Sequence, residues 1–115
     1  MGYRIDFAVT GSTLHARVRG HSPEAKLIAR DIAEQAKRAS VKQLLIDVRG
    51  LVDRLGALGA LVVTAGGQRR VAVVDSLENE PWHPFPEDEA RRRGYRIKYF
   101  CDHDTALSWL AAYAD

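Results

Sequence analysis

Acidic, histidine and cysteine side chains come together in Cys101-Asp-His-Asp104. Carboxylate and imidazole groups are metal ligands, and a cysteine beside a histidine could supply a nucleophile and its base. Adjacent side chains on an extended or capping segment diverge, so we expect Asp102 or Asp104 to cap a helix and predict no metal site. Because neighbouring carboxylates would raise the pKa of the Cys101 thiol, the sequence favours a buried structural cysteine over a reactive one.

A second group of chemically capable side chains is Trp82, His83 and Phe85. Three prolines between positions 81 and 86 predict a segment without regular structure over residues 76–85. Aromatic rings beside a histidine could line a pocket for an apolar ligand, although packing on the protein's own surface is the commoner outcome. We therefore treat Trp82, His83 and Phe85 as a candidate pocket loop.

The run Gly66-Gly-Gln-Arg-Arg70 is glycine-rich and basic, like a phosphate-binding loop. It lacks the Lys-Ser/Thr ending of such loops and follows a predicted helix, whose carboxyl end repels phosphate. Arg91-Arg-Arg93 forms a basic patch that helix-dipole compensation explains equally well. We find no catalytic motif, and we predict that the protein is not an enzyme and needs no cofactor.

The most informative segment is Leu55–Ala65, which holds no charged residue and one polar side chain, Thr64. As a helix it would be apolar nearly all round, although a strand over Leu61–Thr64 is the alternative. One face would pack on the sheet. The other, made of small side chains, needs cover from a second copy, a partner protein or an apolar ligand. This candidate binding surface consists of Gly56, Gly59, Ala60 and Val63.

Length and composition indicate one domain over residues 1–115. The net charge of +2 argues against a broad nucleic-acid surface, which needs a strongly basic face. A single cysteine fits a reducing compartment. Residues 1–20 contain no apolar signal-peptide run, and Leu55–Gln68 is too short and glycine-rich to span a bilayer. We therefore expect a cytoplasmic protein without a membrane span.

Hydrophobic periodicity predicts an α/β fold with a mixed sheet of about five strands and helices on its faces. The run Gln43–Val48 is apolar without alternation, which is typical of a central strand covered on both sides. The predicted order is ββαβαβαβα: strands over 3–9, 14–19, 43–48, 70–75 and 95–100, and helices over 22–40, 55–65, 86–93 and 102–114.

Three segments resemble the STAS superfamily of sulphate-transporter and anti-sigma-factor-antagonist domains: Leu45–Gly50, Arg70–Asp75 and Phe100–Leu110. The likeness covers residues 3–113 and is closer to the prokaryotic single-domain branch, often described as lipid-binding-like by analogy with CRAL-TRIO proteins. It implies a STAS-like fold. Antagonists of this superfamily carry Asp-Ser-x-Gly after the central strand, and a partner kinase phosphorylates the serine. Here Asp53 and Gly56 match, but Arg54 stands at the serine position, so no such switch is expected.

These observations favour a non-enzymatic binding or regulatory module of STAS-like type. It would act through the apolar helix surface on a regulatory protein or, more simply, on a second copy to form a homodimer. The alternative is a carrier or sensor of a lipid or other apolar small molecule, with the Trp82–Phe85 segment as a lid.

Overall fold

Alternating apolar residues at the start of the chain form the predicted hairpin of β1 (Tyr3–Thr10) and β2 (Thr13–His21). The two strands are antiparallel, with Ile5 opposite Val18. The turn between them places Gly11 at a φ of 60°, a conformation that glycine adopts without steric cost. In this computed structural model, residues 3–21, 25–52 and 69–112 are described.

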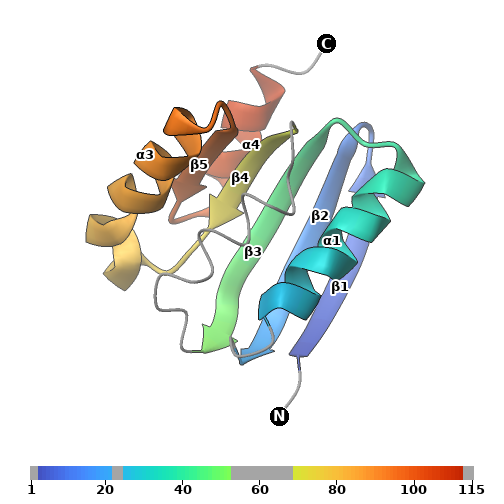
Figure 1. Cartoon of the computed structure of the whole chain (residues 1–115), viewed down its shortest axis with the longest axis horizontal. Coiled ribbons are helices and arrows are strands. Elements are labelled where there is room, and N and C mark those ends of the chain that lie inside the picture. The colour runs from blue at the N-terminus through green and yellow to red at the C-terminus, as the bar shows by residue number, and fades with distance from the viewer. Residues whose placement is uncertain (1–2, 22–24, 53–68, 113–115) are drawn as a thin grey trace.

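The sheet contains five strands in the order β1-β2-β3-β4-β5 (Figure 1). β3 (Gln43–Val52), β4 (Arg70–Val74) and β5 (Arg96–Phe100) run parallel to β2 and to one another. This mixed sheet confirms the predicted α/β fold class, and β5 lies at an edge, as its alternation indicated.

Two strands end two or more residues later than predicted. β3 does not end at Arg49-Gly50 but continues to Val52, and β2 continues through Gly20 to His21. The pairing shifts register between Arg17 and Arg19, which is a β-bulge, and Gly50 lies opposite Arg19. A side chain at position 50 would meet the Cγ atom of Arg19 at 2.7 Å, so glycine allows the two strands to stay paired.

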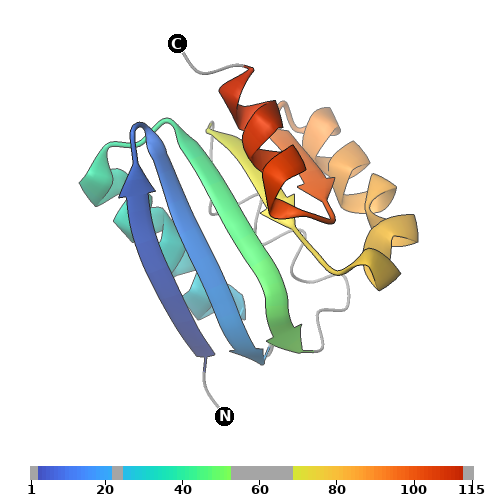
Figure 2. The same cartoon turned by 180° about the vertical axis from the view of Figure 1, so that it is seen from behind.

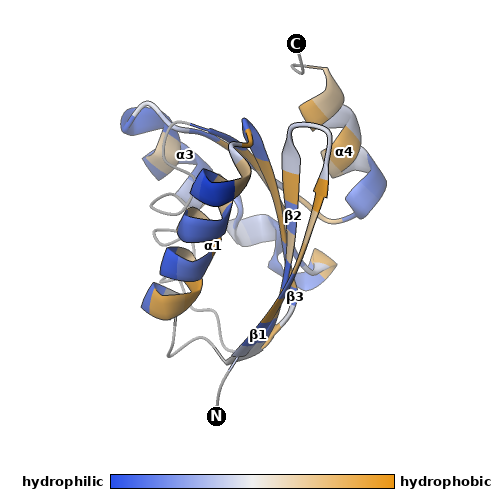
Figure 3. Cartoon of the chain, turned by 90° about the vertical axis from the view of Figure 1, so that its right-hand side faces the viewer, coloured by the Kyte–Doolittle hydropathy of each residue, from blue (hydrophilic) through white to orange (hydrophobic). Residues whose placement is uncertain are grey.

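Helices lie on both faces of the sheet. α1 (Ala25–Ala39) and α3 (Pro84–Arg92) share one face, and α4 (His103–Ala111) lies on the other, over β4 and β5 (Figures 2 and 3). In the described part of the chain, no helix covers this second face of β1 and β2 (Figure 2).

The prediction of an irregular segment over residues 76–85 is wrong. Leu77–Trp82 forms a 3-10 helix, η2, and α3 begins at Pro84 instead of Pro86. Proline breaks a helix only where its missing N–H would have been bonded, and the first turn leaves that N–H unpaired in any case. Pro84 and Pro86 therefore fit the first turn of α3, whereas Pro81 lies inside the short 3-10 helix.

Two cores result, one on each face of β3. The residue pattern Leu44-Leu-Ile alternates between them, which confirms that this strand is buried on both sides. The α1-side core contains Leu14, Ala16, Val18, Ile28, Ala29, Ile32, Ala36, Val41, Leu44, Ile46, Val48, Leu51, Val71 and Val73. The α4-side core contains Leu45, Ala72, Val74, Phe100, Ala106 and Leu110.

The predicted apolar helix over residues 55–65 lies outside the described residues. So do its surface of Gly56, Gly59, Ala60 and Val63, and Arg54 at the expected serine position. Among the residues that are described, no helix is long and apolar enough to span a membrane.

Candidate functional site

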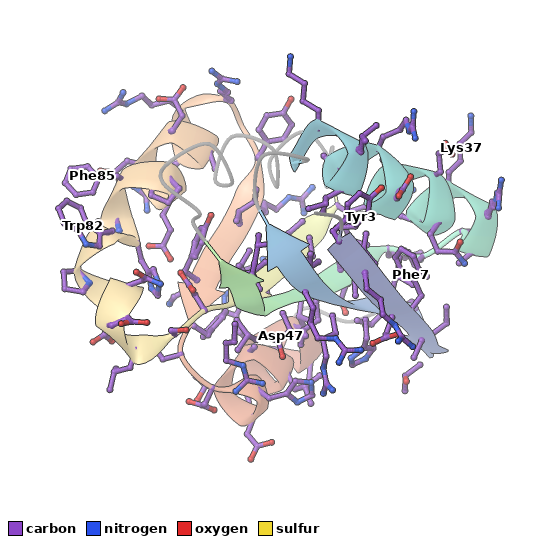
Figure 4. All side chains as sticks on the ribbon, turned by 90° about the horizontal axis from the view of Figure 1, so that it is seen from below. Tyr3, Phe7, Lys37, Asp47, Trp82 and Phe85 are labelled. Atoms are coloured by element: carbon purple, nitrogen blue, oxygen red, sulfur yellow. The ribbon has the colours of Figure 1, made fainter. Side chains whose placement is uncertain are left out.

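Two aromatic side chains project from the segment that joins β4 to β5. Trp82, the last residue of η2, is 65% exposed, and Phe85, in the first turn of α3, is 66% exposed. Their ring centroids lie 6.0 Å apart. Figure 4 shows both rings on the outer side of the segment, pointing away from the sheet. Leu77, at the start of η2, is 69% exposed. We call Trp82 and Phe85 the aromatic patch.

His83 lies between the two aromatic residues in sequence but points into the protein. Its side chain is buried, with Nε2 3.5 Å from Oδ2 of Asp75 and its ring centroid 5.0 Å from that of Tyr99. The structure thus separates the three residues of the candidate pocket loop: Trp82 and Phe85 face solvent, and His83 anchors the segment to β4 and β5.

Asp75 completes this anchor. It follows β4 directly, and its backbone N–H donates to the carbonyl oxygen of Phe100 at 2.8 Å. Its Oδ1 accepts from the backbone N–H of Ser76 at 2.7 Å and from Nδ2 of Asn79 at 3.2 Å. The carboxylate therefore fixes the start of η2 and faces His83 as well. The sequence prediction missed this role of Asp75; its position at the carboxyl end of a buried strand was the available signal.

Tyr99 and Glu87 hold α3 against the edge strand. The backbone N–H of Tyr99 donates to Oε2 of Glu87 at 2.7 Å. Burial raises the pKa of the Tyr99 hydroxyl, and the negative charges of Asp75 and Glu87 raise it further. The ring is therefore a neutral packing surface for His83 at physiological pH.

The residues at the carboxyl end of β5 make structural contacts with α4 and β2. Asp102 caps α4, as predicted, by accepting from the backbone N–H of Thr105 at 2.8 Å. The centroid of the His103 ring lies 6.0 Å from that of His15 on β2. No group of three or more potential ligands converges anywhere in residues 3–21, 25–52 and 69–112.

Cys101 is half-exposed, not buried as the sequence suggested. Partial desolvation raises the pKa of its thiol, and the charges of Glu80, Asp75 and Asp102 act in the same direction. The direction of the shift is the predicted one, and it disfavours the reactive thiolate.

The basic patch at the end of α3 is largely paired within its own helix. Arg91 donates to Asp88 at 2.7 Å and Arg93 to Glu89 at 2.9 Å, with Arg92 3.7 Å from the latter. The guanidinium of Arg70, the last residue of the glycine-rich run, lies 5.1 Å from the centroid of the Trp109 ring. These contacts favour structural roles for both arginine groups.

The five-stranded sheet with helices on both faces is a STAS-like α/β fold, as the resemblance implied. An anti-sigma factor antagonist from Mycobacterium paratuberculosis has a similar structure, with a TM-score of 0.72 and 14% sequence identity over 96% of this chain and 95% of its own. An uncharacterized protein with a SpoIIAA-like fold from Shewanella loihica matches with a TM-score of 0.58 and 21% identity, over 95% and 94% of the two chains. No family profile and no curated protein sequence matches the chain. Identities this low show a common fold.

Proposed function

We propose that this protein is a non-enzymatic regulatory module that binds a partner protein through the aromatic patch. The observation that carries the proposal is the pair of exposed rings, Trp82 and Phe85, on a segment anchored by buried His83. Exposed tryptophan on a rigid support suits a binding hot spot, because large rings bury much apolar area at little entropic cost. A regulatory role agrees with the fold, since one protein that shares it is named an anti-sigma factor antagonist.

The chemistry of the patch defines the partner. The rings are apolar, and η2 beside them carries Glu78 and Glu80. The complementary surface is an apolar groove with lysine or arginine at its rim. A cytoplasmic location, expected from the sequence, is part of this proposal.

The predicted surface of Gly56, Gly59, Ala60 and Val63 remains a second candidate docking site, and homodimerisation through it remains a prediction. The carrier alternative also remains, in which the apolar face of that helix would form one wall of a pocket. The homodimer predicts a native mass of two chains, and the carrier predicts a single chain with a bound lipid-sized molecule.

Photo-cross-linking tests the proposal in cells of the source organism. A benzophenone amino acid at position 82 should capture one protein. The same probe at the exposed position Arg96, at the start of the edge strand β5, should not capture it. The captured protein is then purified, and its affinity for the wild type and for Trp82→Ala is measured by calorimetry. We expect about a 30-fold loss for the variant, the value of a hot spot near 2 kcal/mol.

Three outcomes would contradict the proposal. Equal affinity of Trp82→Ala and the wild type would exclude the patch. Loss of binding only in Gly59→Glu would move the site to the predicted helix. A lipid-sized adduct in the native mass spectrum, removed by Trp82→Ala together with Phe85→Ala, would favour the carrier.

A further inference from the structure

β1 forms one edge of the sheet, and within the described residues no strand pairs with its outer side. On the α1 face of this edge, Tyr3, Ile5 and Phe7 pack against the core but stay half-buried. Leu27 lies one helical turn before Asp31, which accepts a hydrogen bond from the Tyr3 hydroxyl, so it flanks the same edge, and it is 39% exposed. The edge therefore presents an apolar strip that α1 covers only in part.

The opposite face of β1 carries charges of both signs. Arg4 and Asp6 are two residues apart, so they share a face, with side chains 74% and 43% exposed. Desolvation opposes ionisation of Asp6, but hydrogen bonds from Arg19 and Arg4 and their positive charges hold its pKa below the usual range. Edge strands that avoid pairing commonly carry charges that repel a second edge. An Arg and an Asp at this spacing do the opposite, since they are complementary to the same strand running antiparallel.

We propose that β1 pairs with β1 of a second copy of this chain, antiparallel and centred on Ile5, to make one continuous sheet across a homodimer. A closed two-fold pair keeps both copies of α1 on the same face. In this register Ile5 lies opposite Ile5, and Tyr3 opposite Phe7. On the other face, Arg4 of each copy lies opposite Asp6 of the other.

Charge selects this register over its neighbours. Residues opposite each other in an antiparallel pair lie on the same face of the sheet. The two-fold axis must therefore pass between the two copies of one residue of β1, and the alternative registers are centred on the neighbouring residues. A centre at Arg4 would place the two copies of Arg4 opposite each other. A centre at Asp6 would place the two copies of Asp6 opposite each other. A centre at Phe7 would leave Asp6 opposite Ala8 and form no ion pair. Like charges directly opposite destabilise a sheet, whereas opposite charges and aromatic pairs stabilise it.

The same register extends a charge arrangement that already exists inside each chain, where Asp6 forms ion pairs with Arg4 and Arg19. Within the hairpin, Arg4 lies opposite Arg19, and Asp6 lies opposite Arg17. Pairing of two copies would place Asp6 of one chain on the free side of Arg4 of the other. Positive and negative side chains would then alternate across the joint. The long apolar strip on the α1 face would be covered at the same time by its own symmetry mate.

This inference is independent of the proposed function. Figure 1 shows β1 at the edge of the sheet away from β5 and α3, so a dimer of this kind leaves the aromatic patch free. The interface also differs from the predicted surface of Gly56, Gly59, Ala60 and Val63, and variants can separate the two.

Native mass spectrometry of charge-reversed variants tests the register. The wild type should have twice the mass of one chain at micromolar concentration. Arg4→Asp places a carboxylate opposite Asp6 of the second copy, and Asp6→Arg places a guanidinium opposite Arg4, so each variant alone should have the mass of a single chain. Mixed together, the two variants regain complementary charges and should form a dimer with one chain of each.

The matched control is Arg96→Asp, the same charge reversal on the opposite edge strand, which should stay dimeric. Circular dichroism establishes that each variant is folded. If Asp6→Arg does not fold because Arg19 loses its partner, Arg4→Asp against Arg96→Asp decides the question, since Arg4 is largely exposed. A monomeric wild type would overturn the proposal. So would a dimer that Arg4→Asp leaves intact, or a dimer that only Gly59→Glu dissociates.

Discussion

Asp47 is a buried carboxylate whose charge is stabilised mainly by Arg49. Its side chain lies on the face of β3 toward α4 (Figure 4) and accepts from Nε and Nη2 of Arg49 at 3.1 and 2.8 Å and from the backbone N–H of that residue at 3.0 Å. Burial alone would raise the pKa of Asp47, but these bonds and the charges of Arg49 and Arg17 lower it overall. The folded protein therefore binds a proton at this site less readily than the unfolded chain does.

A pKa lowered by folding stabilises the protein above the ordinary pKa, about 4 for aspartate, and this contribution is lost as the pH falls through the folded value. We expect the free energy of unfolding of the wild type to exceed that of Asp47→Asn at pH 7. The difference should shrink steadily below about pH 4. Urea denaturation at several pH values measures it. Ser108→Ala, which changes an exposed side chain of α4 that has no titratable group, is the control and should show no such trend. A difference that is constant with pH would contradict this account.

At the scale of elements, the joint between β2 and β3 depends on a close approach of two backbones. Where the pairing shifts register, Gly50 lies against Arg19, and an added Cβ would also come within 3.3 Å of the carbonyl oxygen of Val18. The Cγ atom of Arg19 is close to its own backbone and cannot move away as freely as the end of the side chain. The strands must therefore separate locally, or the bulge must change, if residue 50 has a side chain.

Gly50→Ala should accordingly destabilise the protein by about 1–3 kcal/mol, the usual cost of overpacking. Arg19→Ala removes the atom that the new methyl group would meet. The same glycine substitution should cost less in that background. Thermal or urea unfolding of the four members of this double-mutant cycle tests the argument. Equal costs in both backgrounds would show that Arg19 is not the obstacle.

At the scale of the whole molecule, stability depends on a sheet that is covered on both sides. Consecutive residues of β3 enter different cores: Leu44 is fully buried on the α1 side, and Leu45 is 1% exposed on the α4 side. The second core also holds α4 through Gln43, whose Nε2 donates to the carbonyl oxygen of Leu110 at 2.9 Å. Weakening the core on either face of the sheet should therefore destabilise the whole domain.

We expect Leu44→Ala and Leu45→Ala each to lower the free energy of unfolding by about 2–5 kcal/mol, the usual range for truncating a buried leucine to alanine. Ile5→Ala should cost clearly less in the monomer, since Ile5 is only half-buried at the sheet edge. Urea denaturation followed by far-ultraviolet circular dichroism measures all three. If Leu45→Ala cost no more than Ile5→Ala, the α4 layer would not be an integral part of the core.

Local patterns were sufficient for the order of the five strands and for the helices α1, α3 and α4. Alternation predicted the β1–β2 hairpin, the unbroken apolar run predicted a central strand, and the charge and hydrogen-bonding capacity of Asp102 predicted a helix cap. Each of these signals acts between residues a few positions apart. Local reasoning was wrong for residues 76–85, where proline was given only its helix-breaking role, and for the end of β3, where Gly50 permits pairing with a distant residue.

The sequence by itself determined the fold class and the kinds of side chain available to bind. Only the tertiary structure decided which of them face solvent. His83 is buried because Asp75, directly after β4, and Tyr99, from β5, contact it at the end of the sheet, while Trp82 and Phe85 point outward. The same holds for β1. Its Arg4 and Asp6 are available to a second copy only because β1 lies at an edge of the sheet. Such positions depend on contacts between residues far apart in the chain, which no local periodicity encodes.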